Sequence, residues 1–149
     1  MSEQHRIVVG VDGSKSSKAA LAWAVRQAEL TGASVDAVIA WHYPIAFGGT
    51  PLTPVGALMD TDFAAAAARV LNIAISETTN PAGPVKISST VREGNAAPIL
   101  LEAADGSDLL VVGSRGHGGF AEALLGSVSQ HCVHHAPCPV VIIRGPRDR

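Results

Sequence analysis

Apolar positions fall into short β-branched runs and longer helical segments that alternate along the chain. Such runs predict strands at residues 6–11, 34–41, 108–114 and 139–144, and the alternation of apolar and polar residues predicts a further strand at residues 85–93. Helical spacing of apolar residues, or runs of alanine, predicts helices at residues 14–32, 57–79, 95–106 and 127–136. A Pro- and Gly-rich segment, 42–56, is expected to form a loop.

The order of these elements indicates an α/β fold. Five strands that alternate with four helices are typical of a parallel sheet covered by helices on both faces. Such a doubly wound sheet reverses its winding once, which places the first strand beside the fourth and opens a crevice at their carboxyl ends. Asp12 follows the first strand, and Gly113 ends the fourth. Because the fourth and fifth strands are the most uniformly apolar, we expect both in the sheet interior.

Composition places the chain among ordinary globular proteins. Its 149 residues fit one domain, residues 1–149, and 47% of them are hydrophobic while 16% are charged. A formal net charge of −2 offers no basic surface for nucleic acid or an anionic membrane. We therefore expect neither as a partner, and an anionic ligand would have to be held by local groups.

The N-terminal segment and the longest apolar run both favour a cytoplasmic protein. The first ten residues lack the basic start and long apolar stretch of a secretory signal. The densest apolar run, FAAAAARVLNIAI, is too short to span a bilayer and contains Arg69. The two cysteines, Cys132 and Cys138, suit a compartment in which thiols stay reduced.

The segment GSRGHGGFAEALLGSVS, residues 113–129, concentrates glycine at the predicted crevice. Five glycines lie within its first fourteen positions. Glycine at 113 and 116 would let backbone N–H groups approach a phosphate without obstruction by a Cβ atom. Arg115 and His117 could add positive charge from the same loop. The pattern therefore indicates an anion site.

A helix is expected to begin where this segment ends. Ser127 and Gln130 match the S-x-x-Q capping box, which predicts Ser127 as the N-cap. The unpaired N–H groups and positive dipole of a helix N-terminus favour an anion. The hydroxyls of Ser127 and Ser129 could donate to phosphate oxygens.

Two common phosphate-binding motifs are absent. The Walker A pattern is missing, and no lysine lies between residues 87 and 149. A dinucleotide fingerprint would need glycine at Ala121 and would follow the first strand, not the fourth. The remaining alternative is that the glycines only shape a long turn and that the cap is only a cap.

The spacing G-x2-G-x9-G-S, formed by Gly113, Gly116, Gly126 and Ser127, resembles the ATP-binding branch of the universal stress protein family. The stretches VVGVDGS and HAPCPVVIIR also match, so the resemblance covers nearly the whole chain. It implies an adenine nucleotide alpha hydrolase-like fold, a five-stranded parallel sheet in the order 3-2-1-4-5. It also implies an ATP-binding regulatory protein of the stress response, in which occupancy modulates dimer or partner contacts.

The same resemblance implies where the nucleotide and a second subunit would bind. Asp12 would face the ribose, and the backbone at Ala40 would meet the adenine edge. Independently of the resemblance, Mg²⁺ could bridge phosphate oxygens with Asp12 nearby. A homodimer would form along the last strand, which starts at Pro139 and ends at Arg144. Val112 would flank the nucleoside. The full expected nucleotide site is Gly10, Val11, Asp12, Ala40, Val112, Gly113, Ser114, Arg115, Gly116, His117, Gly118, Gly119, Gly126, Ser127, Val128 and Ser129.

Several of these side chains, and some others, could have a purely structural role instead of a ligand-binding one. Asp12 could be a turn former or helix cap rather than a ligand-facing group. Trp23, among helix alanines, is expected in the core, whereas Trp41 and His42 could either border the adenine or pack locally. The group Cys132, His134, His135 and Cys138 looks like a metal cluster, but its spacing favours buried thiols and partly exposed imidazoles at a helix end.

Binding is favoured over catalysis. The chain offers no lysine for the phosphates and no evident base beside Ser127, so we expect no catalytic residue and at most slow ATP hydrolysis. The alternatives are an adenylating enzyme, a cyclic AMP binder, and a ligand-free dimeric scaffold. The scaffold alternative is based on PVVIIR, because an uncovered apolar edge strand invites pairing.

Overall fold

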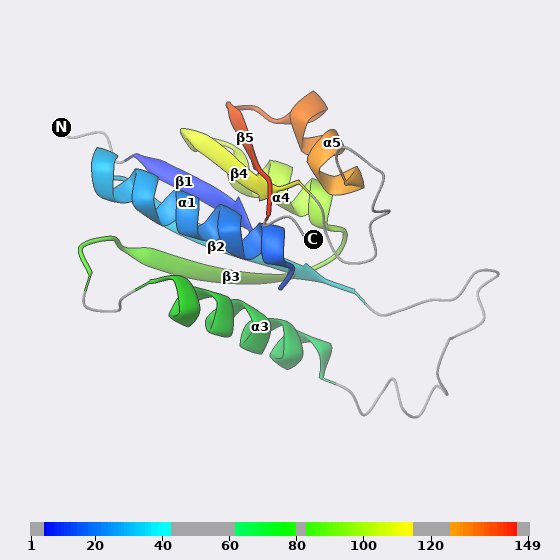
Figure 1. Ribbon diagram of the computed structural model, residues 1–149. Helices are drawn as coiled ribbons and strands as arrows, with labels where there is room; N and C mark the ends of the chain where they lie inside the picture. Colours follow the sequence, from blue (N-terminus) through cyan, green and yellow to red (C-terminus); the bar gives the residue numbers. More distant parts are fainter. Residues whose placement is uncertain (1–4, 43–61, 80–82, 115–125, 146–149) are drawn as a thin grey trace, which may run out of the picture.

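The computed structural model describes residues 5–42, 62–79, 83–114 and 126–145. Strands and helices alternate in them as predicted, although several of their ends differ from the predicted ones (Figure 1). The elements are β1 (Arg6–Gly10), α1 (Lys15–Thr31), β2 (Ser34–Trp41), α3 (Phe63–Thr78), β3 (Ile87–Glu93), α4 (Ala96–Ala104), β4 (Leu109–Gly113), α5 (Ser127–His135) and β5 (Val140–Ile143).

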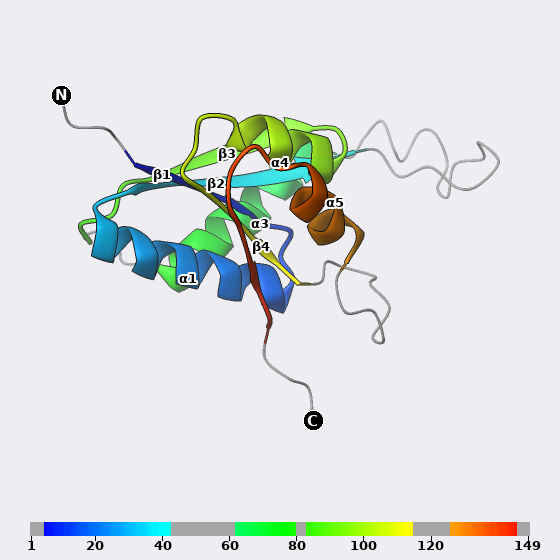
Figure 2. The ribbon, with the colours of Figure 1, turned by 90° about the horizontal axis from the view of Figure 1, so that it is seen from above.

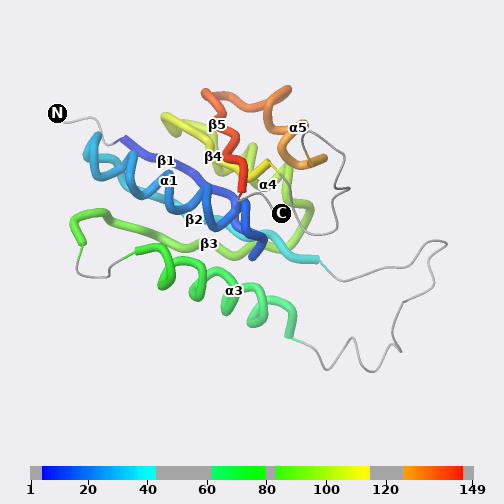
Figure 3. The backbone as a smooth tube through the Cα atoms, viewed as in Figure 1, coloured from blue at the N-terminus to red at the C-terminus, as the bar shows by residue number. Residues whose placement is uncertain are grey.

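All five strands form one parallel sheet in the order β3-β2-β1-β4-β5, which confirms the expected fold. Helices α1 and α3 cover one face of the sheet, and α4 and α5 cover the other (Figures 1 and 2). The tube in Figure 3 follows the chain from β1 out to β3 and then back past β1 to β4 and β5. This single reversal is the switch point at which ligands bind in open α/β sheets.

Alternating side chains of the central strands fill the two cores. Val9 of β1 packs on the α1 and α3 side, whereas Val8 packs on the α4 and α5 side, and both are fully buried. The central strands carry apolar residues on both faces of the sheet, and not only at alternate positions, because helices cover both faces.

The expectation that both apolar strands are interior is wrong for β5. This strand pairs only with β4 and lies at the sheet edge, and its four residues are all partly exposed. Val141 and Ile143 pack against one core, while Val140 and Ile142 pack against the other. A strand covered on both faces needs apolar side chains throughout even when one of its backbone edges has no neighbour.

Helix ends follow local capping chemistry. The Oγ atom of Ser14 accepts the N–H of Ser17 at 3.3 Å, and Gly32, with φ 78°, ends α1 in the left-handed region, as predicted. Helix α3 begins later than expected, because Asp62 is its N-cap and accepts the N–H of Ala65 at 2.9 Å. Residues 57–61, where the helix was predicted to start, lie outside the described residues.

None of the described helices combines the length and the apolar character that crossing a membrane requires.

Candidate functional site

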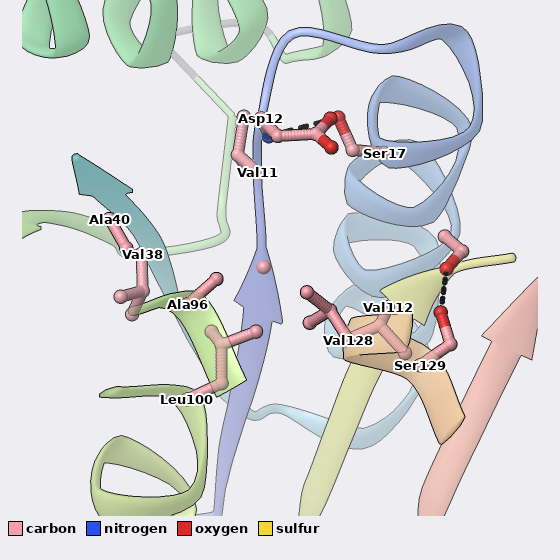
Figure 4. A pocket seen from close by; sticks show the side chains of 12 residues that line it. Val11, Asp12, Ser17, Val38, Ala40, Ala96, Leu100, Val112, Val128 and Ser129 are labelled. Carbon is pink, nitrogen blue, oxygen red and sulfur yellow. Dashed lines mark hydrogen bonds between the residues drawn. The ribbon is translucent and has the colours of Figure 1, made fainter. Parts of the chain in front are cut away.

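A pocket opens at the carboxyl ends of β1 and β4, at the switch point of the sheet (Figure 4). It encloses about 470 Å³, including space open to solvent. Its lining is mainly apolar, as is typical of ligand pockets. The lining residues are Gly10, Val11, Asp12, Ser17, Val38, Ala40, Ala96, Leu100, Val112, Gly113, Val128 and Ser129.

Aliphatic side chains from four elements form the walls. Figure 4 shows Val38 and Leu100 on one side, with Val112 and Val128 on the other. At Gly10, on the strand between them, a Cβ atom would lie 2.8 Å from Cδ1 of Leu100. The absence of a side chain at Gly10 thus lets the Leu100 side chain pack closely against β1 at this end of the strand.

Asp12 both lines the pocket and shapes the turn into α1. Its Oδ1 accepts the N–H of Ser14 at 2.8 Å, and its own N–H donates to Oγ of Ser17 at 3.2 Å. The two interpretations of Asp12 are therefore compatible, because a carboxylate has further lone pairs to offer a ligand hydroxyl.

Three helix N-termini meet at the pocket. Ser17 lies in the first turn of α1, Ala96 is the first residue of α4, and Val128 lies in the first turn of α5. None of these helices carries an acidic side chain in its first turn. Their positive dipole ends are therefore not neutralised by side chains of their own first turns, which favours an anion at this edge of the sheet.

The predicted capping box at Ser127 is wrong. Gly126 is the N-cap of α5, and its carbonyl accepts the N–H of Gln130 at 3.0 Å, so Ser127 is already helical. The N–H of Gly126 donates to the carbonyl of Ser114 at 2.7 Å, which ties the helix start to the end of β4. The first-turn N–H groups, those of Ser127, Val128 and Ser129, have no partner within a helix.

Ser129 holds α5 against β4. Its Oγ donates to the carbonyl of Gly113 at 2.5 Å, and the side chain is buried. This hydroxyl proton is therefore engaged by the backbone, and the hydroxyl available to a phosphate is that of the exposed Ser127.

The structure gives a different reason for glycine at 113 from the one expected. A Cβ atom there would lie 2.7 Å from the carbonyl carbon of Ser16 and 2.8 Å from the backbone nitrogen of Ser17. Glycine at 113 therefore permits the start of α1 to pack on β4. The neighbouring N–H of Ser114 donates to the carbonyl of Ile143 at 2.8 Å, so Ser114 links β4 to β5.

Eight of the expected site residues line the pocket, three lie beside it, and five cannot be placed. Ser114, Gly126 and Ser127 lie next to the lining without forming part of it. The residues that line it as expected are Gly10, Val11, Asp12, Ala40, Val112, Gly113, Val128 and Ser129. Those outside the described residues are Arg115, Gly116, His117, Gly118 and Gly119.

Four lining residues were not predicted. Val38 is the parallel partner of Gly10, so the sheet register brings it to the same edge. Ala96 and Leu100 are four residues apart on α4 and share one helix face. Ser17 follows from the turn at Asp12. The sequence predicts the helix that carries Ala96 and Leu100, but it does not show that this helix lies beside the pocket, which depends on the order of the strands in the sheet.

The thiols and tryptophans lie away from the pocket lining. Burial raises the pKa of the Cys132 thiol to about 11, and Sγ of Cys138 lies 3.5 Å from Oγ of Ser107. Trp23 and Trp41 pack against the α1 and α3 core, and the Trp41 ring stacks on Phe63 at 6.5 Å. Trp41 therefore does not border the pocket.

Comparison with known proteins identifies the family. A profile of the universal stress protein family matches residues 4–144. Universal stress protein Rv2623 of Mycobacterium tuberculosis is 33% identical over 138 residues, which are 92% of this chain and 46% of that protein. The chain thus spans about half the length of the curated relatives it matches.

Solved structures of this family share the fold. Universal stress protein UspA from Lactobacillus plantarum superposes with a TM-score of 0.78 at 24% identity, covering 97% of this chain and 100% of that chain. A universal stress protein solved in complex with cAMP superposes with a TM-score of 0.61 at 28% identity, with the same coverage. Because the profile matches nearly the whole chain and a relative is 33% identical, the chain belongs to the universal stress protein family.

Proposed function

We propose that the chain is an ATP-binding regulatory protein of the stress response and that the pocket at the switch point is its nucleotide site. The observation that carries the proposal is an apolar slot that adjoins the first turn of α5. An adenine nucleotide matches both features, because its flat base can be buried in the slot while its phosphates lie at the start of the helix.

The slot fits the nucleoside. The base would lie among the aliphatic walls formed by Val38, Leu100 and Val112, and the backbone at Ala40 would meet its edge. Asp12 accepts a ribose hydroxyl with the lone pairs that Ser14 does not use. These roles need only side chains and backbone that already line the pocket.

The phosphates extend toward α5. The first-turn N–H groups of Ser127 and Val128 and the hydroxyl of Ser127 donate to them, aided by the helix dipole. Ser129 does not donate to phosphate in this arrangement but fixes the helix by its bond to Gly113. Arg115 and Gly116, which lie outside the described residues, are proposed to complete the phosphate site.

Mg²⁺ would be held mainly by the phosphates. Asp12 is the one carboxylate among the described lining residues, and its Oδ1 already accepts the Ser14 N–H. Side chains of lysine or arginine are absent from that lining. These features support binding and provide little for phosphoryl transfer.

Nucleotide binding is proposed to alter the exposed edge of β5, where a second copy of the chain would pair. Backbone hydrogen bonds connect Gly126 to Ser114 and Ser114 to Ile143, so the start of α5 is joined to the end of β5. Sedimentation of the protein with and without Mg-ATP tests this step. A dimer whose dissociation constant is unaffected by saturating Mg-ATP would contradict it.

Calorimetric titration of nucleotide-free protein with Mg-ATP and with adenosine tests the site, using two variants of the same helix. Val128→Glu places a carboxylate where the phosphates would lie, and Val133→Glu places one on the exposed side of α5. We expect Val128→Glu to weaken Mg-ATP binding at least about tenfold through charge repulsion, with a smaller effect on adenosine. Val133→Glu should bind like wild type, and equal affinities in all three proteins would contradict the proposal.

Cyclic AMP is the second candidate ligand, favoured by the relative solved with it. The number of donors at α5 favours the longer polyphosphate. Tighter binding of cAMP than of Mg-ATP in the same titration would reverse this preference.

A further inference from the structure

The last turns of α5 carry histidines that the proposed nucleotide site does not use. The sequence HCVHH places imidazoles at 131, 134 and 135. His131 and His135 are four residues apart, so their side chains lie on one face of the helix. Their ring centroids are 4.7 Å apart with an interplanar angle of 42°, and both side chains are exposed.

This geometry is suited to chelation. Two imidazole nitrogens that bind one Zn²⁺ at about 2.0–2.1 Å must themselves lie about 3 Å apart. Ring centroids at 4.7 Å bring this spacing within the reach of small side-chain rotations. His134 is less well placed, because its ring centroid lies 6.4 Å from that of His135 in an edge-on arrangement.

The surroundings favour a cation there. His135 is the last residue of α5, so the pair lies at the negative end of the helix dipole. A neutral imidazole offers a nitrogen lone pair to a metal and is the commonest protein ligand of transition metals. The structure records no ion pair or hydrogen bond of either ring within the described residues.

We propose that His131 and His135 form a two-ligand site for a borderline divalent transition metal, with Zn²⁺ as the reference ion. Imidazole is a preferred ligand of Zn²⁺, Ni²⁺ and Cu²⁺, and water fills the remaining positions. The described residues contain no group of three or more metal-ligating side chains, so the site is an open chelate and not a closed structural centre. Bound metal would clamp the last turns of a helix that is only nine residues long.

Calorimetric titration of the tag-free protein with Zn²⁺ alone tests the site. We expect His131→Ala and His135→Ala each to weaken Zn²⁺ binding at least about tenfold, because either change removes the chelate. His134→Ala, on the same exposed helix end, is the matched control and should change the affinity less than about twofold. Wild-type affinity in either of the first two variants, or an equal loss in His134→Ala, would overturn the proposal.

A second measurement does not depend on variants. Substoichiometric Zn²⁺ should shift the imidazole NMR signals of His131 and His135 before those of His5 and His42, which lie elsewhere on the chain. Simultaneous shifts of all histidine signals would mean only scattered surface binding and would overturn the proposal.

Discussion

Gly10 and Gly113 lie on neighbouring strands, yet a side chain at each position would meet different surroundings. At Gly10 a Cβ atom would press on the mobile end of Leu100, inside the pocket. At Gly113 it would press on the backbone of Ser16 and Ser17, which cannot move without shifting α1. One glycine therefore shapes the site, and the other permits helix packing.

Alanine at the two positions should separate these roles. We expect Gly113→Ala to lower the free energy of unfolding by about 1–3 kcal/mol, the range for overpacked cores. Gly10→Ala should lower the free energy of unfolding by less than Gly113→Ala does, because the Leu100 side chain can rotate away. Its effect on the free energy of Mg-ATP binding should be larger than its effect on the free energy of unfolding. Urea denaturation and nucleotide titration of both variants measure the two effects. Equal stability losses would argue against the distinction.

Ser127 and Ser129 are expected to differ in the same way. Ser129→Ala removes the hydrogen bond to the Gly113 carbonyl and should lower the free energy of unfolding by about 1 kcal/mol. Ser127→Ala, at an exposed position without a side-chain cap, should change stability by less than about 0.5 kcal/mol while weakening Mg-ATP binding. A larger stability loss in Ser127→Ala would indicate that it caps the helix after all.

At the scale of single elements, the position at which α3 starts can be tested by whether a substitution at Asp62 raises or lowers the stability of the protein. If Asp62 is the N-cap, Asp62→Ala removes its bond to the Ala65 N–H and destabilises the protein by about 1 kcal/mol. If the helix already ran through this position, as the alanine-rich pattern predicted, alanine would be the better helix former and would stabilise it. Thermal unfolding of the variant distinguishes the two starts.

Helix α5 can be followed through its thiol. Cys132 is fully buried, and its raised pKa keeps it protonated, and hence unreactive, at neutral pH. We expect iodoacetamide to label the partly exposed Cys138 first under native conditions, with Cys132 labelled only as α5 detaches. Peptide mass spectrometry measures the order, and early labelling of Cys132 would show that α5 is not stably packed.

Periodicity was sufficient to predict the elements but not all of their positions. Apolar runs predicted β1, β2 and β4, because these strands are covered on both faces and contain few polar residues, whereas β3 was predicted from its alternation. The same rule placed β5 inside the sheet, since an apolar pattern reports covered faces and says nothing about which backbone edges are paired.

The pocket lining was predicted where it follows directly from strand ends. Gly10, Asp12 and Val112 come at or just after β1 and near the end of β4, so the fold class alone brings them together. Val38 and Leu100 were not predicted, because their contribution depends on register and on how α4 packs across the sheet. The hydroxyl of Ser129 was assigned to phosphate because the sequence does not show that the Gly113 carbonyl is near.

At the scale of the whole molecule, helix N-termini gather at one place in a chain that has no net positive charge. Its formal charge is −2, yet three helix N-termini without first-turn acidic residues converge on one pocket. Backbone dipoles act over a short range and are most effective where solvent is partly excluded. An anionic ligand in this pocket would therefore have to be held by local groups and not by the overall charge of the chain.

The central claim is that the pocket between β1, β4 and the first turn of α5 binds an adenine nucleotide. Titration of ¹⁵N-labelled protein with Mg-ATP, followed by amide NMR, tests it most directly. We predict that the largest shifts occur at the amides of Ser127 and Val128 and at Gly10 and Asp12 across the pocket. Saturating Mg-ATP that leaves these four signals unchanged, or that shifts signals only elsewhere in the molecule, would contradict the claim.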